Sequence, residues 1–90
     1  MTEKDLIPGT VVQHFKRKML TEAERADSTQ YLYEILGVAH HTETGEKLVV
    51  YRALYGEWKI CARPLDMFLS ETDHEKYPQA EQKFRFEPLK

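Results

Sequence analysis

The sequence predicts a mostly-β fold, a small SH3-like barrel of about five short strands. Short runs rich in β-branched and aromatic residues recur along the chain, and glycine or proline separates most of them. The chain has only 90 residues, which suits one domain with a thin core. We expect a long polar loop between the first two strands and a short helical turn before the last strand. An open meander with a helix packed on it is the alternative.

Composition predicts the domain boundaries and the compartment. Residues 1–8 are mostly polar and end at Pro8, so we expect a disordered lead-in, one SH3-like β domain over 9–87 and a tail over 88–90. No apolar run approaches the ~20 residues of a membrane span, and the start lacks the basic and apolar regions of a signal peptide. Cys61 is the single cysteine, which is typical of a reducing compartment. We therefore expect a cytoplasmic protein.

The first strand is followed by a polar insertion. Residues 10–15 are β-branched and aromatic, which predicts the first strand. Residues 16–30 are charged and have few large apolar side chains, so we expect an inserted, exposed loop. Within this loop, Thr21 followed by Glu24 fits a capping box, which predicts a helical turn over 21–26.

The strongest strand pattern spans residues 31–41, which are largely apolar on both alternating faces and therefore predict a covered central strand. Gly37 in the middle of this run predicts a bulge or a bend. A loop over 42–46, in which Gly45 is free to adopt positive φ, leads into a partner strand over 47–55.

Two further strands complete the predicted sheet. Residues 58–63 form the fourth strand, and Pro64 ends its pairing because proline has no N–H to donate. Residues 64–69 form a helical turn whose apolar side chains plug one end of the sheet. After a polar, irregular stretch over 70–82, residues 83–87 alternate in polarity and predict the last short strand.

Several short motifs follow one another in a fixed order through the middle of the chain. They are His14-Phe15-Lys16, Tyr33-Glu34-Ile35-Leu36-Gly37-Val38-Ala39, His41-Thr42-Glu43-Thr44, Val49-Val50-Tyr51, Leu54-Tyr55-Gly56, Arg63-Pro64 and Met67-Phe68. This series resembles an uncharacterised bacterial family, domain of unknown function 1653, over roughly residues 9–69. The resemblance implies an SH3-like barrel and no assigned activity. Two departures are that most of 16–30 is extra here, and that the family often has tryptophan at the position of Cys61.

The overall charge argues against nucleic acid as the main partner. Thirteen basic and fifteen acidic side chains give a formal net charge of -2, whereas nucleic-acid-binding domains usually carry a basic excess. The basic triplet Lys16-Arg17-Lys18, with aromatic residues nearby, keeps a nucleic-acid-associated accessory domain as an alternative. Acidic residues follow the triplet directly and weaken its field.

His41 and Glu43 form the most suggestive polar pair. They can share one face of a strand, but no further ligand follows at a metal-binding spacing, so we expect no metal and no cofactor. A small enzyme using His41 as a general base is the least favoured alternative, because no nucleophile and orienting group accompany it. Cys61 lies between apolar residues, which predicts a packed thiol.

The leading hypothesis is a non-enzymatic, cytoplasmic bacterial binding module. Tyrosine, tryptophan and phenylalanine side chains outnumber what a thin core can fully bury, so some of them should line a groove. Two arginines on strands would border that groove and suit a peptide or a small anionic ligand. We expect a monomer or weak dimer with no membrane partner. The predicted ligand-binding residues are His41, Glu43, Tyr51, Arg52, Tyr55 and Arg63.

Overall fold

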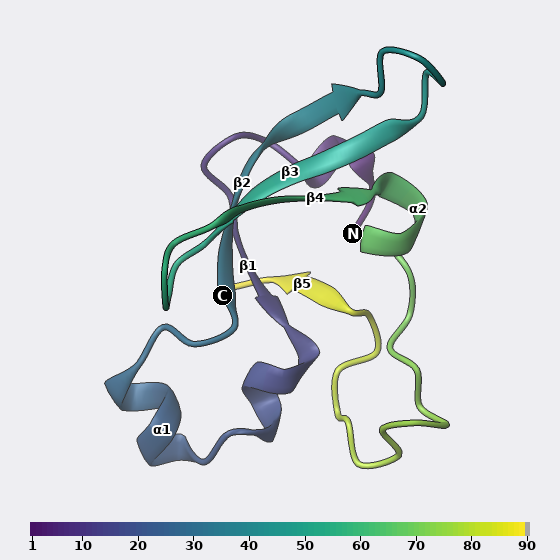
Figure 1. The fold of residues 1–90 in the computed structure, drawn as a ribbon. Coiled ribbons are helices and arrows are strands. Elements are labelled where there is room, and N and C mark those ends of the chain that lie inside the picture. The colour runs from purple at the N-terminus through teal and green to yellow at the C-terminus, as the bar shows by residue number, and fades with distance from the viewer. Residues whose placement is uncertain (90) are drawn as a thin grey trace.

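The computed structural model describes residues 1–89, and its main element is one antiparallel sheet (Figure 1). The strands are β1 (Val11–His14), β2 (Leu32–His40), β3 (Lys47–Ala53), β4 (Ile60–Pro64) and β5 (Phe86–Pro88). Their order in the sheet is β4-β3-β2-β1-β5, so the first four strands form a meander and the last returns beside β1. The mostly-β prediction is confirmed.

The sheet is open, and the predicted closure into a barrel is wrong. β4 pairs only with β3, β5 pairs only with β1, and no ladder joins these two edges within residues 1–89. β5 is three residues long and ends at Pro88, which lacks an N–H for a further ladder. The structure therefore agrees better with the alternative of an open meander carrying a helix. Of the expected tail, Pro88 belongs to β5 and Lys90 lies outside the described residues.

The predicted irregularity at Gly37 is confirmed as a β-bulge. Ile35 pairs with Tyr51, but Gly37 pairs with Val50, so the register shifts between them. Strict alternation would place Val38 on the face opposite Ile35. Because the bulge adds a residue, Val38 instead packs against the core.

The short helices lie at the ends of the sheet. They are η1 (Glu3–Asp5) and η2 (Phe15–Met19), both 3-10 turns, and α1 (Glu22–Asp27) and α2 (Leu65–Phe68). The predicted plug is α2, whose Phe68 is fully buried and stacks on Phe86 with ring centroids 4.1 Å apart. Within residues 1–89 no helix is long and apolar enough to cross a membrane.

The core includes a residue from the lead-in. Its buried members are Leu6, Val12, Ile35, Val49, Tyr51, Phe68 and Phe86. Leu6 follows η1, whose Asp5 carboxylate accepts the backbone N–H of Thr2 at 2.8 Å. A single leucine between polar residues gives no periodic pattern, so the expectation of a disordered lead-in did not foresee this contact.

The insertion is held together by a buried arginine. The predicted helical turn is confirmed as α1, with the reciprocal Thr21 and Glu24 capping bonds. Arg17 of η2 is buried and donates to the carbonyl oxygens of Arg25, Ser28 and Gln30 at 2.8 to 3.1 Å. These charge-assisted bonds tie the far end of the insertion to its start.

Candidate functional site

His41 and Glu43 lie in the exposed turn between β2 and β3. The His41 Nδ1 accepts the backbone N–H groups of Glu43 at 3.2 Å and of Thr44 at 3.3 Å. The imidazole therefore stabilises the turn, as an asparagine or aspartate side chain often does. This pair is distant in the fold from the aromatic residues that the sequence also singled out.

Tyr51 and Arg52 point to opposite faces of β3 because they are neighbours on one strand. Tyr51 lies in the core with only 5% of its surface exposed. Arg52 is paired across the sheet with Glu34 on one side and Ile60 on the other. The two residues therefore cannot border the same groove.

The other predicted residues meet in an aromatic cluster. Arg63 Nε donates to the Tyr51 hydroxyl at 3.4 Å, and the guanidinium lies 5.8 Å from the centre of the Phe86 ring. The hydroxyls of Tyr33 and Tyr55 are 2.7 Å apart. The structure thus brings Tyr51 and Arg63 together, and the Tyr33 ring lies between Tyr51 and Tyr55. Tyr51 is buried in the core, whereas Tyr55 also lines a hollow.

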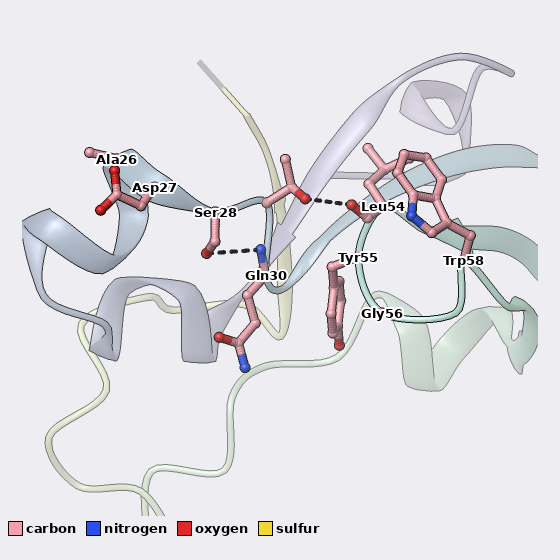
Figure 2. Close-up of a pocket in the computed structure, with 9 residues that line it drawn as sticks. Ala26, Asp27, Ser28, Gln30, Leu54, Tyr55, Gly56 and Trp58 are labelled. Carbon is pink, nitrogen blue, oxygen red and sulfur yellow. Dashed lines mark hydrogen bonds between the residues drawn. The ribbon is translucent and has the colours of Figure 1, made fainter.

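A wide hollow lies beside the turn between β3 and β4 (Figure 2). Its volume is about 670 Å³, and its lining consists of Ala26, Asp27, Ser28, Thr29, Gln30, Leu54, Tyr55, Gly56 and Trp58. The Thr29 hydroxyl donates to the Leu54 carbonyl and joins the two sides. Trp58 is 56% exposed at one end of the hollow. Asp27 lies on the opposite side in Figure 2 and is the one ionisable residue of the lining other than Tyr55. This hollow offers no cationic group for an anion.

A smaller cleft concentrates positive charge. Its volume is about 220 Å³, and it is lined by His14, Phe15, Lys16, Asp73, Lys76, Tyr77 and Arg85. We call it the cationic cleft. It forms where η2 meets the segment between α2 and β5, and Figure 1 shows these two parts side by side below the sheet. Lys16 and Lys76 lie 5.5 and 5.6 Å from the centre of the Tyr77 ring.

The cations of this cleft are not neutralised by nearby carboxylates. The ion pairs within residues 1–89 are Lys47–Glu3, Lys59–Glu57 and Lys83–Glu71, and none of them involves the cleft. Asp73 is its one acidic residue, and its Oδ1 accepts the backbone N–H groups of Glu75 and Lys76 at 3.1 and 3.2 Å. The cleft is therefore electropositive in a chain whose formal charge is -2.

Arg85 brings hydrogen-bond donors that find no acceptor in the fold. Its backbone is fixed, since its N–H donates to Ser70 and its carbonyl accepts from Phe15, both at 3.0 Å. Its side-chain Nε is buried and has no partner within residues 1–89. Buried polar groups nearly always have a partner, so the unpaired guanidinium nitrogen beside this cleft is an exception.

His14 lines the cleft as an uncharged ring. Its Nδ1 accepts the backbone N–H of Lys16 at 3.2 Å, which caps η2. Burial of the ring, followed by the charges of Lys16, Arg63 and Arg85, lowers the pKa of His14 from 6.5 to about 4. At neutral pH the imidazole is therefore neutral, and because Nδ1 acts as an acceptor, its hydrogen resides on Nε2.

Sequence reasoning missed most of this cleft. Lys76 and Tyr77 lie in the stretch 70–82, which the sequence predicts to be polar and irregular. Arg85 lies in 83–87, where the alternation predicts only a strand. Nothing in local sequence links these residues to His14, which lies 71 positions before Arg85. The motif His14-Phe15-Lys16 was the one available indication.

No characterised protein and no solved structure is significantly similar to this chain. A family of sequences, however, matches most of the chain. Its description is protein of unknown function (DUF1653), and the match covers residues 10–88, which extends the resemblance past residue 69 to the end of β5. The match includes the whole sheet and both sides of the cationic cleft. The chain therefore belongs to the DUF1653 family of proteins of unknown function.

Proposed function

We propose that this protein is a non-enzymatic binding module that holds a small anionic ligand in the cationic cleft. One observation carries the proposal: the buried Arg85 Nε without a partner lies beside a cleft whose two lysines, Lys16 and Lys76, form no ion pair within residues 1–89. An anion would supply the missing acceptor and the missing negative charge together.

The chemistry of the lining suits a phosphate or carboxylate group. Arg85 offers a planar set of donors, the lysines offer point charges, and the Nε2–H of neutral His14 is a further donor. Ligand pockets for whole drug-sized molecules span roughly 300–1,000 Å³. A cleft of about 220 Å³ therefore suits the charged group of a ligand whose remainder extends beyond the cleft.

A binding role also fits the state of His14. General-base catalysis needs an imidazole nitrogen with a free lone pair. Here Nδ1 is occupied by the Lys16 N–H, and Nε2 carries the hydrogen. A cytoplasmic location remains part of the proposal, because Cys61 is a free cysteine.

The nucleic-acid alternative is weakened because the basic triplet Lys16-Arg17-Lys18 does not form one exposed surface. Arg17, the centre of the basic triplet, is buried and bound to three carbonyl groups of the insertion. Lys16 belongs to the cleft, and only Lys18 of the triplet is left exposed on the outer surface. An extended basic surface along this segment is therefore not available.

The test is a titration of ¹⁵N-labelled protein with inorganic phosphate, in which the amide chemical shifts are recorded at each concentration. We expect shifts at Lys16, Tyr77 and Arg85, and affinity weaker by at least about tenfold in Arg85→Gln and Lys76→Ala, since each loses a charge-assisted bond. The matched control is Lys4→Ala, which removes one exposed charge outside the cleft.

Two results would contradict the proposal. If Lys4→Ala weakens binding as much as Lys76→Ala, phosphate responds only to overall charge. If no shifts appear near the cleft, the unpaired guanidinium has no anionic partner. A short single-stranded oligonucleotide, added in a parallel titration, tests the alternative, because its binding would shift Lys18 and weaken steeply with salt.

A further inference from the structure

A third hollow lies at the β3–β4 end of the sheet and shares no residue with the cationic cleft. It has a volume of about 310 Å³ and is lined by Tyr33, Ala53, Tyr55, Gly56, Glu57, Lys59 and Cys61. We call it the tyrosine hollow. Its volume falls at the lower end of the range for small-molecule pockets.

The hollow contains a hydroxyl pair with a hydrogen to spare. The Tyr33 and Tyr55 oxygens are 2.7 Å apart, so one hydroxyl donates to the other. The second hydroxyl hydrogen has no acceptor among the hydrogen bonds of residues 1–89. Burial, and then the hydrogen bond with Tyr55, raises the pKa of Tyr33, so this hydroxyl keeps its hydrogen.

The remaining lining is largely apolar and carries no net charge. Ala53 presents a methyl group, and Cys61 is a half-buried free thiol. The two charged residues, Glu57 and Lys59, form an ion pair with each other at 3.1 Å and are mostly exposed. The ring faces and this neutralised rim favour a neutral ligand over an ion.

We propose that the tyrosine hollow binds a small, neutral, apolar molecule through a carbonyl oxygen. That oxygen would accept the spare hydroxyl hydrogen of the Tyr33–Tyr55 pair, while the apolar part of the molecule packs against Ala53 and the tyrosine rings. A hydroxyl that already accepts a hydrogen bond is polarised and becomes a better donor, which strengthens such a contact. The ligand and the residues differ from those of the anion site, so this proposal stands independently.

The experiment uses two probes of similar shape, acetophenone and ethylbenzene, which differ in the carbonyl oxygen. Binding to the full chain is followed by NMR shifts of the Ala53 methyl group and the Cys61 amide. We expect acetophenone to bind about tenfold more tightly, the effect of one hydrogen bond to an otherwise unpaired donor. The double variant Tyr33→Phe/Tyr55→Phe keeps both rings but removes both hydroxyls, so it should lose this preference, because either hydroxyl alone could still donate to the carbonyl. The control Tyr77→Phe, which alters the other cleft, should keep the preference.

A second readout does not require a variant. Iodoacetamide modifies Cys61, and acetophenone at saturation should slow this reaction, because the thiol lines the same hollow. Equal affinity of the wild-type protein for the two probes, or a preference that survives in Tyr33→Phe/Tyr55→Phe, overturns the proposal. So does an alkylation rate of wild-type protein that acetophenone leaves unchanged. Phosphate binding to the cationic cleft is measured separately and is expected to be unaffected.

Discussion

Arg17 illustrates how one side chain organises a segment that would otherwise lack a core. The insertion buries no residue of α1, and most of its surface is polar. Its shape depends on hydrogen bonds from Arg17 to three carbonyl groups and from Arg25 to the carbonyls of Lys18 and Leu20. Arginine suits this position because its guanidinium presents five donors in one plane.

Replacing Arg17 with methionine should loosen the insertion. The variant loses three bonds, and since water can reach part of the freed carbonyls, we expect a loss of roughly 1–2 kcal/mol in the free energy of unfolding. Hydrogen exchange should accelerate over residues 17–30 and much less in the sheet. Urea unfolding and exchange mass spectrometry measure both effects.

Lys18→Met is the matched control because Lys18 is the exposed neighbour of Arg17. An exposed substitution usually changes stability by less than about 0.5 kcal/mol. If Lys18→Met destabilises the protein as strongly as Arg17→Met, the three buried bonds are not what holds the insertion.

His14 predicts how stability depends on pH. Its pKa is about 4 in the folded protein and 6.5 ordinarily, so the unfolded chain binds the proton more readily between these values. The contribution of neutral His14 is therefore fully present above about pH 6.5 and is lost as the pH falls toward 4. Because solvent screens a half-buried ring, we expect the free energy of unfolding to fall by about 2 kcal/mol over this pH range.

The measurement compares urea unfolding of wild-type protein and His14→Gln at pH 7, 5.5 and 4.5. Glutamine can still accept the Lys16 N–H but does not titrate. We expect the wild-type protein to lose more stability than the variant as the pH falls. A parallel decline of the two proteins would show that other groups cause the acid sensitivity.

At the scale of elements, the four-residue helix α2 completes the core. It follows directly after β4 and places Phe68 against Phe86 of β5. This one helical turn therefore connects the two edge strands of the sheet through side-chain packing. Tyr51, from the interior strand β3, packs on Phe68 at a centroid distance of 5.2 Å. The open sheet has its apolar face covered in this way without closing into a barrel.

The substitution Phe68→Ala should therefore lower the free energy of unfolding strongly. Loss of a fully buried phenylalanine costs about 3–5 kcal/mol, which is comparable to the whole stability expected of a 90-residue domain. When unfolding is monitored by circular dichroism, we expect the thermal transition to be absent or its midpoint temperature to be much lower. Met67→Ala, one residue earlier and 48% exposed, should shift it little. Similar shifts in the two variants would argue against α2 as the plug.

At the scale of the whole molecule, the two proposed binding sites lie at the edges of the sheet. The cationic cleft forms between η2 and the segment before β5, and the tyrosine hollow forms at the opposite, β3–β4, edge of the strand order. Each lining combines strand residues, such as His14 and Cys61, with residues of the segments between strands, such as Tyr77 and Glu57. The two hollows, chemically different, thus lie at opposite edges of one sheet.

The local features were readable from residues close together in sequence. The Thr21–Glu24 capping box, the Gly37 bulge and the apolar alternation of β3 each depend on neighbours within a few positions. Such patterns act through backbone hydrogen bonds and side-chain periodicity, which short segments already specify. The family resemblance added the order of these motifs.

The two proposed binding sites and part of the core depend on contacts between distant segments. His14 meets Arg85, Leu6 enters the core, and Tyr33 meets Tyr55 because the sheet folds these positions together. The barrel prediction failed for the same reason, since closure depends on whether β4 and β5 reach each other and not on the content of either strand. Local sequence was sufficient for the strands, the cap and the bulge, whereas edge pairing and the positions of unpaired donors arise only from packing across the whole chain.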